Sequence, residues 1–328
     1  MKKIFLFLIL AIVAFSACDK NDEPTTEIKP VIDSLVSGAG YANDVFYSME
    51  NGVVKTQPRA EWDLAFATIA QSISIHVNTG SKDSLFLWKG GDINDFDMAE
   101  ELDNSDRLAS NFDTTSWFNY SAFEMGRLED DVFDQGWGIY NMTTHDVTGD
   151  SLFILKLANG TYKKIAIMKR FAADYSFVFK IADLAKDAPA TEVTVAPGKT
   201  STMNFVYYSV ATNTVFNREP DKTTWDFVFT KYDSRIPGYP LVSGILTNED
   251  IETAKIAEAD STISYLDVDF SKKISNIGFD WKHFNGATYD ITNPYYYIHA
   301  QDGNYYRIKF LSFDFSTGVT VFEKKLLK

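Results

Sequence analysis

Two short motifs in this chain contain residues that could hydrolyse an ester. Gly149-Asp-Ser-Leu152 has the form of a hydrolase nucleophile block, and Asp280-Trp-Lys-His283 supplies an Asp-x-x-His pair that could activate a serine. A serine of this kind needs an exposed turn between a strand and a helix. Ser151 instead opens an apolar run with the character of a β-strand. We therefore expect no catalytic residues and no enzyme activity.

The four histidines do not form a metal-binding pattern. His76, His145, His283 and His299 lack the close spacing that a zinc site requires, so we predict no zinc. His76 shares strand parity with polar neighbours, and we expect it on an exposed strand face. His299 shares parity with two tyrosines, an arrangement more typical of sheet packing than of a cofactor wall.

The elements that would position these residues are mostly strands. Apolar residues alternate with polar ones in the segments 72–78, 306–312 and 319–323, a period of two that predicts half-buried antiparallel strands. Asn159-Gly160 and Asp302-Gly303 stand between such runs and predict hairpin turns. The fold class is therefore all-β, built from antiparallel sheets.

Helical signals are scarce. Residues 94–102 predict one short helix, the segment 192–196 is interpreted as a strand, and the segment 250–259 could be either a helix or a strand. Pro189, Pro197 and the Ala- and Thr-rich residues around them mark a linker. We expect minimal helix overall.

The N-terminus has the form of a lipoprotein signal. A basic start, a short apolar run and Ser16-Ala17 precede Cys18, the only cysteine of the chain. We predict a signal peptide over 1–17, lipidation of Cys18 and a disordered tether over 18–30. The acidic residues after Cys18 resemble a surface-export signal of lipoproteins, and a plain spacer is the alternative.

Composition restricts the class of partner. The formal net charge is −14, which disfavours nucleic acid and anionic membranes as partners. Hydrophobic residues make up 45% of the chain, so a core can form without disulfides.

The chain also contains an internal repeat. Val45-Phe-Tyr-Ser48 and Trp62-Asp63 recur as Val206-Tyr-Tyr-Ser209 and Trp225-Asp226. Further on, Trp137 and Trp281 each precede an aspartate by nine residues. Each copy must then be a similar structural unit. We predict unit 1 over 31–184 and unit 2 over 191–328, in tandem.

The repeated pattern resembles the HmuY family of haem-binding outer-membrane lipoproteins. The resemblance rests on Trp225-Asp-Phe-Val-Phe229, Ile277-Gly-Phe-Asp-Trp281-Lys-His-Phe-Asn285, Tyr295-Tyr-Tyr-Ile298 and Asp302-Gly-Asn-Tyr-Tyr-Arg-Ile-Lys-Phe310. It implies two HmuY-like β-rich units at the cell surface. It also implies a role in iron acquisition, with haem or a haem-carrying protein and a TonB-dependent receptor as partners.

Members of that family hold haem iron with His or Met side chains, and both are competent axial ligands. Met142 and His145 stand in a polar segment that matches a ligand segment of the family, so the resemblance implies haem as cofactor with one of them as ligand. Phe133, Trp137, Ile139 and Tyr140 could form an apolar wall beside them. A solvent-exposed loop histidine is the alternative for His145, and a surface lipoprotein that binds carbohydrate or protein is the alternative function.

Overall fold

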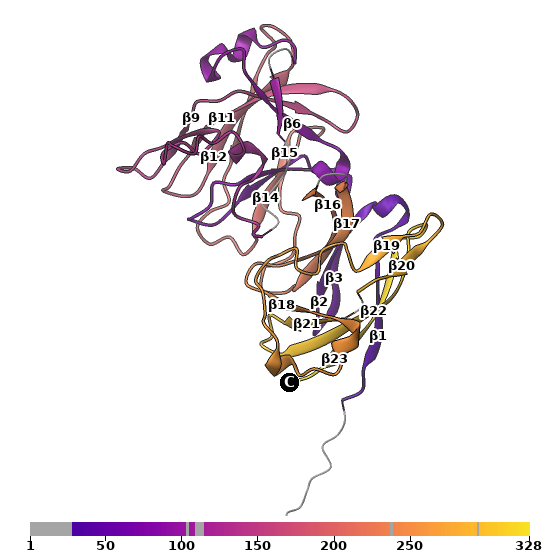
Figure 1. The fold of residues 1–328 in the computed structure, drawn as a ribbon. Helices are drawn as coiled ribbons and strands as arrows, with labels where there is room; N and C mark the ends of the chain where they lie inside the picture. Colours follow the sequence, from indigo (N-terminus) through magenta and orange to yellow (C-terminus); the bar gives the residue numbers. More distant parts are fainter. Residues whose placement is uncertain (1–27, 103–104, 109–114, 237–238, 294) are drawn as a thin grey trace, which may run out of the picture.

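The computed structural model describes residues 28–102, 105–108, 115–236, 239–293 and 295–328. Within these residues the chain forms antiparallel β-sheets gathered in two lobes (Figure 1). The helices that the described residues contain are all short 3-10 turns: η1 (Ala39–Tyr41), η2 (Arg59–Glu61), η3 (Thr79–Ser81), η4 (Ile93–Met98), η5 (Ala122–Glu124), η6 (Glu258–Asp260) and η7 (Tyr265–Asp267). The predicted all-β class is confirmed.

The first lobe, the upper one in Figure 1, contains two sheets. The larger sheet has the order β13 (Thr191–Val195), β12 (Phe177–Asp183), β11 (Tyr162–Arg170), β10 (Phe153–Lys156), β6 (Ser84–Trp88) and β7 (Ser105–Leu108). The hairpin of β8 (Gly138–Tyr140) and β9 (Val147–Gly149) joins it through β11. The smaller sheet has the order β15 (Thr214–Phe216), β14 (Phe205–Ser209), β4 (Leu64–Ala67) and β5 (Ile75–Val77).

The second lobe repeats this plan. Its larger sheet has the order β1 (Val31–Val36), β23 (Val319–Leu326), β22 (Tyr305–Asp314), β21 (Tyr295–His299) and β18 (Glu252–Ile256). The smaller sheet has the order β17 (Tyr239–Thr247), β16 (Phe227–Ile236), β2 (Asn43–Ser48) and β3 (Gly52–Pro58). A hairpin of β19 (Lys282–Phe284) and β20 (Tyr289–Ile291) follows Trp281, as the hairpin of β8 and β9 follows Trp137, but it forms a separate sheet.

The N-terminal strands of the two sequence copies are exchanged between the lobes. β2, from the first copy, pairs with β16 of the second, with Tyr47 opposite Phe227. β14, from the second copy, pairs with β4 of the first, with Tyr208 opposite Leu64. The outer strands follow the same rule, because β1 pairs with β23 and β13 pairs with β12. The sheets therefore do not confirm that the copies fold as tandem units, and the sequence boundaries 31–184 and 191–328 remain predictions.

Each lobe has its own hydrophobic core, and each core contains side chains from both copies. In the first lobe Phe179 packs with Phe66 and with Tyr208 from the second copy. In the second lobe Tyr47 from the first copy packs with Phe227 and with Phe322. Burial of these aromatic side chains contributes several kcal/mol at about 25 cal/mol per Å². The exchange is thus built into both cores.

Most local predictions agree with the strands observed. Gly160 and Gly303 occupy hairpin turns with φ of 86° and 79°, a region that glycine enters without strain. The expected strand over 192–196 is β13, which begins one residue earlier, and the segment 250–259 forms a strand, β18, and not a helix of its full length. The predicted short helix over 94–102 is instead the 3-10 turn η4, whose N-cap Asp92 forms a capping box with Asp95.

The prediction for His76 is wrong. Its side chain is only 3% exposed, and Ser74 and Asn78 on the same face are buried as well. The reason is that both faces of β5 are covered: one by the lobe core, the other by Trp117 and Phe205.

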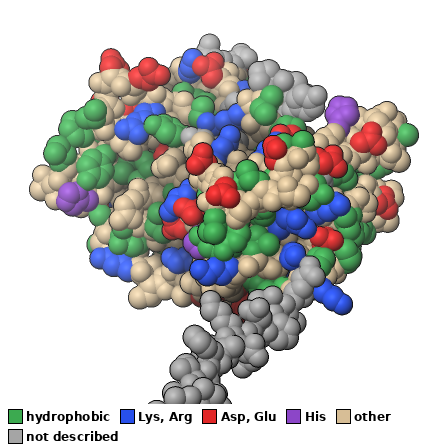
Figure 2. Space-filling view, turned by 60° about the horizontal axis from the view of Figure 1, so that its bottom comes forward, with side chains coloured by type: hydrophobic (Ala, Val, Ile, Leu, Met, Phe, Trp, Pro, Cys, Tyr) green, Lys and Arg blue, Asp and Glu red, His purple; other side chains and the backbone are tan. Residues whose placement is uncertain are grey.

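The predicted signal peptide, Cys18 and most of the tether lie outside the described residues. Among the described residues no helix is long and apolar enough to cross a membrane. On the face that brings the second lobe forward, basic and acidic side chains lie close together among hydrophobic ones (Figure 2).

Candidate functional site

The predicted ligand residues lie in the loop that joins β8 to β9. Met142 is 67% exposed and His145 is also exposed. The loop is braced by the Asn141 side chain, which accepts hydrogen bonds from the N–H groups of Thr143 and Thr144. His145 has a φ of 62°, in the left-handed region, and its N–H donates to the Asn141 carbonyl at 2.7 Å. The loop therefore presents two iron-competent side chains from a well-bonded turn.

The imidazole of His145 is oriented by one hydrogen bond. The hydroxyl of Tyr140 lies 2.5 Å from Nδ1 of His145. The structure gives Nε2 no hydrogen bond within the described chain, so this nitrogen faces outward as a free donor or acceptor. Metal-binding histidines have this arrangement, in which a partner on one ring nitrogen fixes the ring and leaves the other for the metal.

Apolar side chains near the loop are partly as predicted. Ile139 is 41% exposed and Phe133 is 39% exposed, so both are available at the surface. Trp137 is fully buried in the first-lobe core and cannot wall a surface slot. Tyr289, the counterpart of His145 in the second copy, packs against Phe284 and Phe313.

The residues of the two ester-hydrolysis motifs lie in different lobes. Ser151 precedes β10, and its hydroxyl donates to Asp150 at 2.8 Å. His283 lies in β19 of the second lobe. His299 stacks on Tyr305 and lies near Glu252. The described residues contain no group of three or more His, Cys, Asp or Glu side chains that could hold a metal ion.

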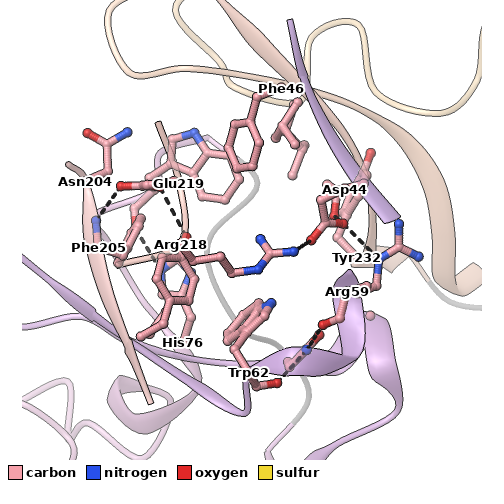
Figure 3. A pocket seen from close by; sticks show the side chains of 18 of the residues that line it. Asp44, Phe46, Arg59, Trp62, His76, Asn204, Phe205, Arg218, Glu219 and Tyr232 are labelled. Atoms are coloured by element: carbon pink, nitrogen blue, oxygen red, sulfur yellow. Dashed lines mark hydrogen bonds and ion pairs between the residues drawn. The ribbon is translucent and has the colours of Figure 1, made fainter. Parts of the chain in front are cut away.

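A cavity of about 60 Å³ lies between the lobes (Figure 3). It separates the outer faces of the two smaller sheets, one carrying β2 and β16, the other carrying β4 and β14. Trp117 packs against both faces, its indole N–H donates to the Thr247 carbonyl, and its own carbonyl lies 2.8 Å from Nε2 of His76. Aromatic side chains make up much of the wall: Phe46, Trp62, Trp117, Phe205, Tyr207, Trp225 and Tyr232.

A buried ion network crosses this interface. Asp44 of β2 bonds to Arg59 at 2.9 Å and to Arg218, from the second copy, at 2.7 Å. Arg218 also contacts Glu61 at 2.9 Å, and the Thr230 hydroxyl donates to Asp44. Burial opposes ionisation of Asp44, but the guanidinium groups of Arg218 and Arg59 outweigh it and lower its pKa. The network thus links β2 of the first copy to Arg218 of the second.

Two further titratable groups line the cavity. Burial raises the pKa of Glu219 to about 7, although the Phe205 N–H and the Tyr207 hydroxyl both donate to its carboxylate. Burial lowers the pKa of His76 to about 3, so its imidazole is neutral at physiological pH. Glu219 is therefore the group of this cavity whose charge changes near neutral pH.

Sequence reasoning missed this cavity. Asp44 and Arg218 are 174 positions apart, and no local motif indicates that they meet. The one available signal was the charged pair Arg218-Glu219 between two aromatic strands, an unfavourable place for charge unless partners exist.

Comparison with known proteins does not assign the chain. No family model, no curated protein and no solved structure matches it.

Proposed function

We propose that this protein is a surface-anchored binding lipoprotein that takes haem at the β8–β9 loop, with His145 or Met142 as an axial ligand. The proposal extends the resemblance to the HmuY family, whose members capture haem for iron acquisition. The observation that carries it is the exposed imidazole of His145, held through Nδ1 by Tyr140 and open at Nε2.

The neighbourhood offers what a porphyrin needs at a surface. Ile139 and Phe133 expose apolar area beside the loop, and covering it contributes at about 25 cal/mol per Å². Bound haem would supply redox-active iron, whose potential depends on the axial ligand.

The test is a haem titration of the mature protein followed by absorbance of the Soret band. We expect a sharpened, shifted band in the wild type and an altered spectrum and spin state in His145→Ala or Met142→Ala. His283→Ala is the matched control, because it removes another exposed histidine, in the second lobe. Identical spectra for all variants would refute the ligand assignment, and no Soret change in the wild type would refute haem binding.

A second function is favoured by a separate observation. The segment 125–142 exposes Met125, Leu128, Val132, Phe133, Ile139 and Met142. A concentration of exposed apolar side chains is typical of an interaction surface. Capture of a carbohydrate or protein partner through this surface, without any Soret change, would favour a partner-binding lipoprotein over a haem binder.

The anchor has its own test. If Cys18 carries the lipid, Cys18→Ser should leave the protein in the aqueous phase of a detergent partition, whereas the wild type enters the detergent phase. Equal partitioning of both forms would show that Cys18 is not the anchor.

A further inference from the structure

An open groove lies at the junction of the two lobes, apart from the small aromatic cavity. Its volume is about 500 Å³, within the range of about 300–1,000 Å³ that is typical of small-molecule sites. Its walls include the segments 69–71 and 116–119, which belong to the first lobe, and the segment 248–250 and Gln301, which belong to the second. The groove is therefore large enough for a ligand that both lobes contact.

Hydrogen bonds hold the first-lobe wall in place. The Arg170 guanidinium donates to the carbonyls of Ile69 and Ala70, at 3.2 and 3.0 Å. The Ser72 hydroxyl donates to the Phe118 carbonyl at 3.0 Å, which ties the two first-lobe segments to each other. The shape of this wall is thus set by the protein itself.

Other hydrogen bonds join the two lobes across the groove. The Ser116 hydroxyl and the Trp117 N–H donate to the Glu249 carboxylate, at 3.1 and 3.3 Å. The Asn204 side chain donates to Oδ1 of Asn248 at 2.8 Å, and these two lining residues are only 3% and 1% exposed. A site that is ordered before binding loses less free energy when a ligand arrives.

The lining is polar. Ten of its twelve residues are polar, and Ile69 and Phe118 are the two apolar ones, so an apolar ligand would find little to pack on. Side-chain amides are the most frequent group: Gln71, Asn119, Asn204, Asn248 and Gln301. An amide both donates and accepts hydrogen bonds, as a hydroxyl does. This composition suits a ligand that carries many hydroxyl groups.

The charged residues of the lining do not select a charged ligand. The carboxylates are Glu249, which already accepts the bonds from Ser116 and Trp117, and Asp250, which lies 3.3 Å from the Lys272 ammonium. Lys222 is the one cation of the lining. An anion therefore meets more negative than positive charge, and a cation meets carboxylates that have partners.

Two amides of the groove are available to a ligand. Gln71 and Asn119 are exposed, and within the described part of the chain their side chains form no hydrogen bond with other residues. Exchanging their bonds to water for bonds to a ligand leaves no group of the protein unpaired.

We propose that this groove binds an uncharged saccharide of one or two sugar residues. The sugar hydroxyls bond to the amides of Gln71 and Asn119, and the C–H face of a sugar ring packs on Phe118, which stacks on Phe205. The groove shares no residue with the β8–β9 loop or with the segment 125–142, so the proposal does not depend on haem binding.

The experiment is calorimetric titration of the whole mature protein with glucose, galactose, mannose, N-acetylglucosamine, maltose and cellobiose, and with glucuronate as a charged counterpart of glucose. We expect saturable binding of at least one neutral sugar. Gln71→Ala and Asn119→Ala should each weaken it roughly fivefold, because each removes hydrogen bonds to the ligand. Asn94→Ala is the matched control, because it removes an exposed amide in η4, outside the groove, and should leave the affinity unchanged.

Nuclear magnetic resonance gives a second measurement on the wild type. The side-chain amide signals of Gln71 and Asn119, assigned by their loss in the alanine variants, should shift on saturation with the sugar, and that of Asn94 should not. The proposal is overturned if no neutral sugar binds saturably, if glucuronate binds more tightly than every neutral sugar, or if Asn94→Ala weakens binding as much as Asn119→Ala. A Soret change without sugar binding would end this proposal and leave haem binding standing.

Discussion

Two backbone N–H groups have equivalents in both lobes. They donate hydrogen bonds to one carboxyl group in the second lobe and to two carboxyl groups in the first. Asp226 accepts the N–H groups of Met49 and Gln301, each at 2.6 Å. In the first lobe these tasks are divided: Asp63 accepts the Val210 N–H and Asp83 accepts the Ala158 N–H. The strand order is the same in both lobes, so the same framework tolerates different arrangements of buried charge.

The divided arrangement brings two buried carboxyls together. Asp83 is 2% exposed, and burial followed by the charge of Asp63 raises its pKa to about 8. Among the described residues no donor lies within hydrogen-bonding distance of Oδ2 of Asp83. The hydrogen bond that this site can form is one in which the carboxyls of Asp63 and Asp83 share a proton. The first lobe therefore carries a titratable pair where the second carries one carboxyl.

A second difference lies in the edge hairpins. Gly138 follows Trp137 in the first lobe, and a Cβ there would lie 2.4 Å from the Thr148 carbonyl oxygen, so glycine is required. Lys282 follows Trp281 in the second lobe and is buried, with Nζ bonded to the Ser243 carbonyl. Lys282 is thus a buried ionisable group whose counterpart in the first lobe, Gly138, has no side chain.

The largest effect should come from breaking the exchange itself. Tyr47 and Tyr208 are equivalent in the repeat, and both are buried in the core of the other copy's strands. Replacing either with Ala should cost about 3–5 kcal/mol. Hydrogen exchange should show Tyr47→Ala loosening β16 and β23, and Tyr208→Ala loosening β4 and β12. The reverse pattern would mean that each copy folds on its own strands.

Asparagine should act in opposite directions at the two aspartate sites. Asp226→Asn places an NH₂ group against one of two backbone N–H donors, so we expect a loss of about 1–3 kcal/mol in the free energy of unfolding. Asp83→Asn can still accept from Ala158 and can donate to Asp63, so we expect a gain of about 1 kcal/mol at pH 7–8.

The sign of the pH effect at Asp83 follows from proton binding. In the unfolded chain Asp83 has its ordinary pKa of 3.8 and loses its proton above that pH, whereas the folded chain keeps the proton to about pH 8. The stability contribution of Asp83 therefore falls as pH rises from about 4 to about 8. Denaturant titrations of wild type and Asp83→Asn over this pH range measure it. If the free energy of unfolding changes with pH in the same way in both proteins, the shared proton is ruled out.

The smallest effect should come from Lys282. Burial lowers its pKa to about 7 from 10.5, while the faces of Trp281 and Phe313, 4.5 and 4.9 Å from Nζ, favour the ammonium form. The unfolded chain binds more protons between pH 7 and 10.5, so the second lobe gains stability as pH rises through this window. Lys282→Met should remove that slope and stabilise the lobe by about 1 kcal/mol at pH 7. If the stability of Lys282→Met changes with pH as that of the wild type does, another group causes the pH dependence.

Local elements of the fold were predictable because their causes are local. The alternation that ends in Ile308 and Phe310 predicts β22, and Asn159-Gly160 predicts the turn between β10 and β11. The exchange was not predictable, because a repeat shows which strands are alike and not which strands pair. The residues next to Tyr47 in the sequence do not show which of the two copies it packs against.

The two candidate sites differ in the same respect, because one depends on a short segment of sequence and the other on distant segments. Met142 and His145 were found because they stand in one short segment, and the structure places both in one loop. The Tyr140 bond that orients His145 could have been suspected from their spacing of five residues. The inter-lobe cavity requires Trp62 and Trp225 to meet across a fold built from exchanged strands, and no spacing in the chain encodes that meeting.

The pairing of β1 with β23 joins nearly the first described residues to the last. The first lobe cannot close until β13 to β15 have been made, and the second cannot close until β23 has been made. Such distant pairings slow folding, and until they form, open strand edges are exposed to other chains. Two molecules at high concentration could then complete each other's sheets, as the two copies do within one chain, and emerge as an intertwined dimer. Refolding yield should therefore depend steeply on protein concentration.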